Sequence, residues 1–526
     1  MICKVRSSHG VFVVVVLWLL VALKASGQAL AHQSTIQAEN TGDAVGAKFG
    51  WTVCSSEEIL AVGAPHYSAQ YGRVTVVQAN ELDEYGVISN VHDVLSNPAG
   101  NTPLQQRFGA SLAHSGAWLA VGNCSAYGTS QYCSASASRV LLYRVSDADV
   151  QPVQVVQEPP GATEGAFGKA LALESDVLAV GGARTGTGSN ARDVVYLYRL
   201  DGGLWQLRDS LFGDGILNGG EERFGHALAL SNGVLAVGAS GDDELGVDCG
   251  AVYLFGRDQG GQEQWGLVRK LLPSNGLAGD RFGTAVALRE SRCAVGAPKR
   301  SINGVVAGSA YVFDRDAGLA DNWGEVAYLE PIGTVSSGMD HGASVAIGAD
   351  RVAVGAPLHD LQIQDEGSVH LYRRQSSEWT SAQRIAPNED GVIGPVGRAG
   401  TSLSFNGNRL LIGAPFAIVN GLTPIQTVPT GAVLVYAEEP VGFLELSGDA
   451  LRLWPNPVDE MLWFSGLTDT RVRAEIQDGL GRTVLELGTI NGEQGSWSLS
   501  GLGNGHYLLV LSNDRGARIV RPFVKA

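Results

Sequence analysis

The side chains that could perform acid–base chemistry are few and scattered along this 526-residue chain. His359 and Asp360 are adjacent and could share a proton, but a lone His-Asp pair in a loop is usually polar surface. The sequence has no G-x-S-x-G segment to present a nucleophilic serine on a sharp turn, and no H-E-x-x-H segment to bind zinc. No catalytic residue is therefore predicted. Whether the protein is an enzyme stays open, with a non-enzymatic role favoured.

A group of acids and a pair of cysteines could hold a cation and a disulfide bond. Asp242, Asp243 and Asp248 lie in one loop and are the candidate metal ligands, although a solvated acidic loop is the simpler interpretation. Cys124 and Cys133 lie in another loop, and in an exported protein such a pair predicts a local disulfide. No cysteines have the C-x-x-C spacing of a zinc site.

Seven repeating units of about 58 residues carry these loops. A first mark ends in glycine and is Phe-Gly in five units, His341-Gly342 in the sixth and Ala399-Gly400 in the seventh. A second glycine follows 14 residues later and closes segments such as LAVGAP. The second glycines are Gly63, Gly122, Gly181, Gly238, Gly296, Gly355 and Gly413. Two marks kept in phase across seven units identify an internal repeat.

Each unit predicts four short antiparallel strands. In the fourth unit they cover Phe224–Leu230, Val234–Ala239, Gly250–Phe255 and Trp265–Leu271, with a tight Ser-Asn-Gly turn after the first. Four strands in each of seven units predict an all-β fold, a seven-bladed β-propeller over residues 32–440. A β-solenoid is the alternative, although its coils are usually shorter.

Two segments compete to complete the seventh blade of this predicted propeller. Ser34–Glu39 precedes the first unit and could supply an outer strand when the ring closes, and Val441–Leu446 could do the same from the other end. The sequence does not decide between them.

The loops after the second strand and between units open on one side of the predicted propeller, which we call the loop face. Variable loops on a rigid framework often carry function, although loops that vary because nothing constrains them are an almost equal alternative. The candidate ligand-binding residues on this face are Tyr127, Tyr132, Arg184, Lys299, Arg300, His359, Asp360 and Phe416.

The two marks resemble FG-GAP repeats, the family of integrin α-subunit heads, and Leu272–Gly283 resembles its bacterial branch. The resemblance implies a seven-bladed propeller. It also implies calcium, because the family often carries D-x-D-x-D-G loops between the first two strands of a blade. Here those hairpins are as short as Ser115-Gly116 and Asn406-Gly407, too short for the several oxygen ligands of calcium. Calcium is therefore not supported, and no cofactor is expected.

The C-terminal residues 450–526 follow a linker at 441–449 and predict a small β-sandwich of short alternating strands. Their motifs resemble the C-terminal sorting domain of the type IX secretion system. The matching residues include Trp454, Pro455, Asn456, Pro457, Gly505, Tyr507 and Lys525. The resemblance implies interaction with that secretion machinery, export through the outer membrane, removal of the domain, and release or attachment at the cell surface.

The first 27 residues have the layout of a secretory signal peptide. A basic start is followed by the apolar run Val11–Leu23 and by small residues, so cleavage after Gly27 or after Ala31 would fit, and an uncleaved anchor is the alternative. No later stretch reaches 18 apolar residues, which predicts no integral membrane span after signal removal. The net charge of −16 argues against nucleic acid as a partner.

The sequence thus predicts an exported protein that binds an extracellular protein or glycan through loop-face residues, in the manner of a cell-surface adhesin. A secreted hydrolase or lyase acting on polysaccharide at the mouth of the propeller is one alternative. A structural scaffold of a surface complex is another.

Overall fold

The computed structural model has strands but no helix among the residues it describes, and it divides into two compact units, Met1–Ala437 and Glu438–Ala526. The described residues are 30–37, 46–56, 59–66, 72–78, 93–96, 107–123, 138–146, 149–160, 162–164, 167–185, 192–215, 221–261, 264–361, 364–376, 378–388, 393, 396–418, 429–438, 452–454, 458–465, 472–477, 483–490, 494–513 and 518–525. No helix in this part of the chain is long and apolar enough to cross a membrane.

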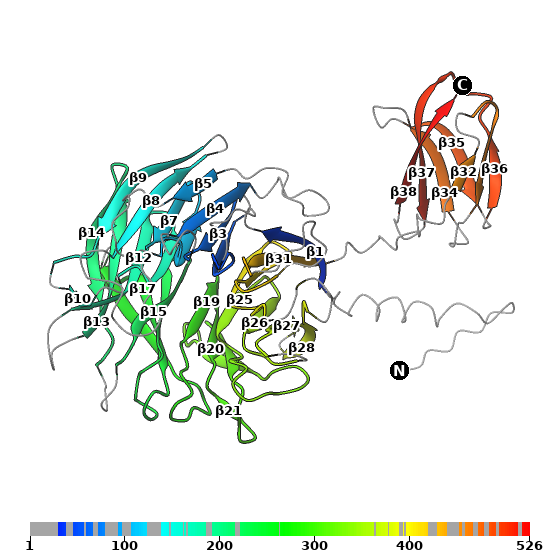
Figure 1. Ribbon diagram of the computed structural model, residues 1–526. Helices are drawn as coiled ribbons and strands as arrows, with labels where there is room; N and C mark the ends of the chain where they lie inside the picture. The colour runs from blue at the N-terminus through cyan, green and yellow to red at the C-terminus, as the bar shows by residue number, and fades with distance from the viewer. Residues whose placement is uncertain are drawn as a thin grey trace. The chain divides into compact units, whose positions relative to one another are not determined.

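In the described part of the first unit, seven antiparallel sheets of four or five strands carry the repeats, and we number them I to VII in repeat order (Figure 1). Sheets I to III hold β2 (Thr52–Ser55), β3 (Ile59–Ala64), β4 (Arg73–Gln78) and β5 (Asp93–Ser96); β6 (Ser111–Ser115), β7 (Trp118–Gly122), β8 (Arg139–Val145) and β9 (Val150–Gln157); and β10 (Ala162–Glu164), β11 (Ala170–Glu174), β12 (Val177–Thr185), β13 (Arg192–Asp201) and β14 (Leu204–Leu211).

The next sheets follow the same order. Sheets IV to VI hold β15 (Phe224–Ser231), β16 (Val234–Ala239), β17 (Ala251–Gly261) and β18 (Gln264–Leu271); β19 (Ala285–Arg289), β20 (Arg292–Ala297), β23 (Ser309–Asp314) and β24 (Gly324–Leu329); and β25 (Ser344–Ile347), β26 (Arg351–Ala356), β27 (Ser368–Gln375) and β28 (Glu378–Ile385). A separate hairpin pairs β21 (Ser301–Ile302) with β22 (Val305–Val306).

Sheet VII combines both ends of the repeat region. Its order is β1 (Leu30–Gln37), β31 (Ala432–Glu438), β30 (Arg409–Ala414) and β29 (Ser402–Asn406). The outer strand is therefore N-terminal and starts four residues before the predicted Ser34–Glu39, while Val441–Leu446 lies outside the described residues.

The second mark explains how the sheets pack against one another. A Cβ built on Gly238 would lie 2.1 Å from the carbonyl oxygen of Gly283 in the next sheet, so only glycine permits this approach. The same approach recurs from sheet to sheet, and a Cβ on Gly413 of sheet VII would lie 2.1 Å from the carbonyl oxygen of Gly50, which precedes sheet I. The second glycine is thus a packing residue and not a ligand-binding one.

The first mark fills the space between sheets. Phe224 and Phe282 are fully buried and pack edge-on against Tyr253 and Tyr311, with ring centroids 5.4 and 5.3 Å apart. His341 occupies the corresponding position of the sixth unit and is also fully buried, as expected for a core position.

The second unit contains two sheets over one core. A three-stranded sheet is formed by β32 (Arg452–Trp454), β33 (Met461–Ser465) and β36 (Gln494–Ser498), and a four-stranded sheet by β35 (Thr483–Ile490), β34 (Val472–Gln477), β37 (Gly505–Asn513) and β38 (Arg518–Lys525). Side chains from both sheets, including Phe464, Trp497 and Phe523, share one apolar cluster.

Candidate functional site

The candidate ligand-binding residues do not form one group in the structure. Tyr127, Tyr132 and the predicted disulfide partners Cys124 and Cys133 lie outside the described residues, as do Pro455, Asn456 and Pro457 of the sorting motif. Arg184 lies on β12, where its backbone pairs with Glu164 and Asp193.

Lys299 and Arg300 are held in ion pairs that join neighbouring loops. The Lys299 ammonium lies 2.6 Å from Asp340, and Arg300, which is buried, lies 2.8 Å from Asp280. Because each cation has a carboxylate partner, these two residues stabilise the loops between sheets IV, V and VI and do not offer an unpaired cation to a ligand.

His359 and Asp360 point into different environments. His359 is fully buried and its Nδ1 lies 2.7 Å from the Ser368 hydroxyl, which is itself 3.0 Å from His370 Nε2. Burial lowers the pKa of the His359 ring. Asp360 is exposed and accepts a hydrogen bond from the Asp365 amide. The two side chains therefore do not share a proton and do not form an acid–base pair at the surface.

Phe416 is the predicted residue that the structure places in a chemically distinctive cluster. Its half-buried ring lies 4.7 Å from the Arg398 guanidinium carbon and 5.1 Å from the Lys48 ammonium, which is also 5.0 Å from the Trp51 ring. A cation and the face of an aromatic ring attract each other electrostatically, so the two rings hold the Lys48 and Arg398 cations in place. We call Lys48, Trp51, Arg398 and Phe416 the cation–aromatic cluster.

The electrostatics of this cluster favour an anionic group. Burial, Arg107 and Arg398 lower the pKa of Lys48, and burial with Lys48 and Arg107 lowers the pKa of the neighbouring His66 to about 4. The repulsion between these crowded positive charges is offset when an anion binds beside them. Arg398 already has one partner, Asp365, at 2.6 Å.

Sequence analysis missed Lys48, Trp51 and Arg398, although a signal for two of them was present. A basic residue immediately precedes the first mark in five units, and all five have positive φ, which turns the chain into the first strand. These residues are Lys48, Arg107, Arg223, Arg281 and Arg398.

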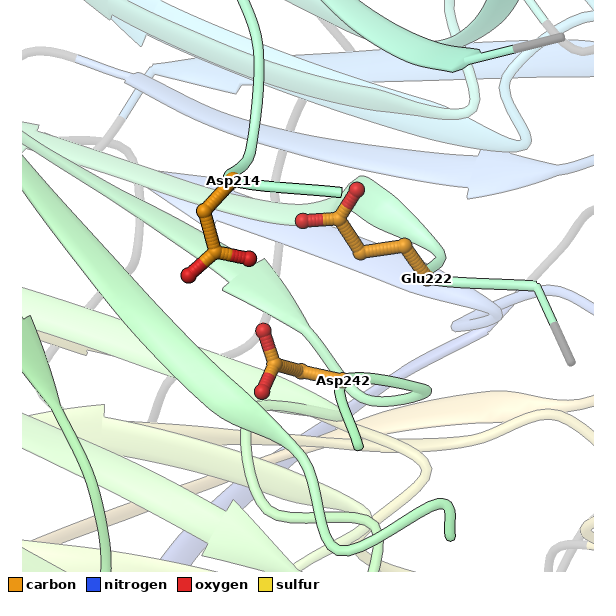
Figure 2. A group of neighbouring side chains, drawn as sticks. All are labelled: Asp214, Glu222 and Asp242. Atoms are coloured by element: carbon orange, nitrogen blue, oxygen red, sulfur yellow. The ribbon is translucent and has the colours of Figure 1, made fainter. Parts of the chain in front are cut away.

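The acidic loop contributes to a different group of carboxylates. Figure 2 shows Asp214, Glu222 and Asp242, whose oxygen atoms lie within 4.8 Å of one another; among the described residues it is the group that fits a metal ion. Of the predicted metal ligands, Asp242 belongs to it. Asp243 is buried and accepts the Asp248 amide at 2.7 Å. The three predicted ligands therefore do not converge on one point.

An ammonium group already contacts this carboxylate group. Lys270 Nζ lies 2.6 Å from Asp214, 2.9 Å from Asp242 and 2.7 Å from Glu244. Burial and the neighbouring acids, Asp242 first, raise the pKa of Glu222 to about 7. Lys270, on sheet IV, thus supplies a cation that these carboxylates contact in the structure.

The acids in the short hairpins also have partners. Asp176 accepts two hydrogen bonds from Arg257 and one from Arg199, each at 3.0 Å, and Asp350 accepts one from Arg373 at 2.8 Å. Because Asp176 and Asp350 are paired with arginine, their two hairpins do not fit the calcium sites that the family resemblance implies.

Three further cysteines are thiols. Cys54, Cys249 and Cys293 are free, and burial raises the pKa of Cys54 and Cys293 to about 12. A thiol with so high a pKa carries almost no thiolate at neutral pH and is a poor nucleophile.

Two family comparisons match the chain. FG-GAP repeat matches residues 219–255 and 265–313, and Secretion system C-terminal sorting domain matches residues 452–525. The comparison with curated proteins gave no match. The chain therefore contains FG-GAP repeats and a type IX sorting domain, and this domain indicates secretion to the outer cell surface or the extracellular space.

Proposed function

We propose that the exported protein is a cell-surface or secreted binding protein, and that it engages an extracellular protein or glycan through the cation–aromatic cluster on its loop face. FG-GAP repeats suggest a binding role. The observation that carries the proposal is the placement of Lys48 and Arg398 over the Phe416 ring. A ligand carboxylate or sulfate could pair with these cations while the rings exclude water.

The framework that we propose for this face is a closed ring of seven blades. Two observations support closure: β1 pairs with β31 in sheet VII, and the Ser402 hydroxyl donates to the Gly50 carbonyl at 3.0 Å. The same hydroxyl-to-glycine bond joins Ser344 to Gly400 within the repeat series. A closed ring would hold the loops rigidly and lower the entropy lost on binding.

The test measures binding of the chain without its signal peptide to polyglutamate, polygalacturonate, matrix proteins and whole bacterial cells. Wild type is expected to bind at least one acidic probe saturably, with affinity that falls as salt rises. Lys48→Gln and Phe416→Ala should each weaken binding about tenfold, equivalent to about 1.4 kcal/mol. Leu319→Ala, at an exposed position, is the matched control.

Two results would contradict the proposal. One is binding that neither Lys48→Gln nor Phe416→Ala changes, which would place the contact elsewhere. The other is breakdown of polygalacturonate by the wild-type protein, which would favour a polysaccharide lyase or hydrolase instead.

A further inference from the structure

The outer strands of neighbouring sheets are joined by a side-chain clamp in two places. The Gln154 amide of β9 donates to the Trp205 carbonyl of β14 at 2.8 Å and accepts the Trp205 amide at 2.7 Å. The Gln383 amide of β28 makes the same pair of bonds to Leu30 of β1, at 2.8 and 2.7 Å. We call this two-way bond the glutamine clamp.

Both glutamines occupy one position of the repeat. Gln154 pairs with Leu142 just before a register shift, and Gln383 pairs with Leu371 just before the equivalent shift. The residue at this position is Asp209 on β14, Arg269 on β18 and Ala327 on β24. None of them can form the clamp, because a carboxylate has no donor for the partner carbonyl, a guanidinium has no acceptor for the partner amide, and alanine has no polar side-chain atom.

A tryptophan lies four residues before this position in sheets III to VI, at or just before the start of the outer strand, and its burial differs from sheet to sheet. Trp205, beside Gln154, is 2 % exposed and packs edge-on against Trp118 at 5.6 Å. Trp265 and Trp379, which follow Asp209 and Ala327 in the repeat, are only half-buried. Trp323, which follows Arg269, is 2 % exposed without a clamp, so the half-exposed indole at Trp265 is a feature of its own groove.

The groove without a clamp between sheets III and IV contains a cavity of about 520 Å³. Trp265 contributes aromatic surface to its lining, and Arg208, Asp209 and Arg257 contribute polar groups. The size falls within the roughly 300–1,000 Å³ of pockets that hold small ligands. No hydrogen bond joins Asp209 to Trp265 among the described residues of this groove.

The charges around this cavity compensate one another. Arg208 lies 2.8 Å from Asp201, and Arg257 makes a two-pronged bond with Asp176 at 3.0 Å. An ionic ligand would have to break these pairs. A neutral ligand with many hydroxyl groups would not, because hydroxyls both donate to the carboxylates and accept from the guanidinium groups.

We propose that the groove between sheets III and IV binds a neutral oligosaccharide, with one face of a sugar ring stacked on Trp265 and its hydroxyls bonded to Asp209, Arg208 and Arg257. A pyranose has an apolar C–H face and a polar rim, which matches a half-exposed indole surrounded by planar polar groups. This site goes beyond the proposed loop-face function: Trp265 and the turns holding Asp176 and Asp201 belong to the hairpin side of the sheets, opposite the loop face.

The test follows the fluorescence and affinity of the exported chain with soluble galactomannan, xylan, mixed-linkage β-glucan and dextran as neutral probes, and polyglutamate as the acidic probe. Wild type should bind at least one neutral polysaccharide, and Trp265→Ala should weaken that binding at least tenfold. Trp265→Phe should retain part of it but lose the fluorescence change. Leu204→Ala, on the neighbouring outer strand β14 and 51 % exposed, should bind as wild type does.

A second variant separates binding from folding. Asp209→Gln should rebuild the clamp onto the Trp265 backbone, keep or raise the melting temperature, and abolish polysaccharide binding. Absence of any Trp265-dependent response to all four neutral polysaccharides would overturn the proposal, as would neutral-probe binding that Trp265→Ala and Asp209→Gln leave intact. The proposed loop-face function is tested by polyglutamate binding and its dependence on Lys48 and Phe416. Its failure would therefore be distinguishable from a failure of neutral-polysaccharide binding at Trp265.

Discussion

The buried histidines between sheets V and VI should make the protein lose stability in mild acid. His341, His359 and His370 are all fully buried, and the rings of His341 and His370 lie 4.8 Å apart. Burial, with a small contribution from His359, lowers the pKa of His341 from 6.5 to about 3. The unfolded chain therefore takes up a proton below pH 6.5 that the folded chain refuses until about pH 3.

The magnitude follows from this difference. Each pH unit within the window lowers the free energy of unfolding by about 1.4 kcal/mol, so moving from pH 6.5 to pH 5 costs about 2 kcal/mol from His341 alone. Stability from this residue is fully present above pH 6.5 and is lost progressively below it. His341→Phe, which restores the residue found in five other units, removes the contribution.

Urea unfolding of wild type and His341→Phe at pH 7.5, 6.5, 5.5 and 5.0 measures the effect. The variant should be close to wild type at pH 7.5, because it loses a 3.0 Å bond to Tyr372 but also removes a buried His341 Nδ1 that has no partner among the described residues. At pH 5 it should be about 2 kcal/mol more stable than wild type. Phe224→Leu alters the same repeat position without a titrating group, so its cost should not change with pH. A constant difference between His341→Phe and wild type across this range would refute the reasoning.

Three further outcomes are expected. Gly238→Ala should lower the free energy of unfolding by about 3 kcal/mol in urea, because its Cβ would lie 2.1 Å from the Gly283 carbonyl; a loss below 1 kcal/mol, roughly the ordinary effect of such a change, would contradict the packing role. Lys270→Met should leave the carboxylates of Figure 2 without their cation, so calcium should raise the melting temperature of the variant and not of wild type. N-terminal sequencing of the exported protein should find cleavage after Gly27, because cleavage after Ala31 would remove Leu30, whose backbone Gln383 clamps.

The repeat made the strands predictable, since each position was observed seven times. The fourth unit was predicted as Phe224–Leu230 and Val234–Ala239, and the structure has Phe224–Ser231 and Val234–Ala239. The sorting unit was predicted less completely: Lys525 was assigned to the sorting motif, but the strand that carries it, β38 (Arg518–Lys525), was not predicted. Its alternation of apolar and basic residues is short and is interrupted by Pro522, which weakens a strand pattern.

The candidate site was harder to predict, because it depends on contacts between distant units. Lys48 and Phe416 lie in the first and seventh units, and the contact between them requires the two ends of the repeat region to meet. Arg300 and His359 illustrate the opposite error, since polar residues in variable loops were expected at the surface and are buried against Asp280 and Ser368. The sequence gives residue type and spacing, but burial decides which polar group remains open to a ligand.

The glutamine clamp illustrates how a repeat can acquire a binding site by losing one contact. Trp205 and Trp265 are both the second residue of their outer strand. With the clamp, two hydrogen bonds join the strands at Trp205, and its indole is buried. With Asp209 in its place these two bonds are missing, and the Trp265 indole is half-buried beside the cavity. Because each clamp contributes about two net hydrogen bonds of roughly 1 kcal/mol, its loss is small against the packing of seven sheets. A site of this kind can therefore arise by one substitution without unfolding the blade that carries it.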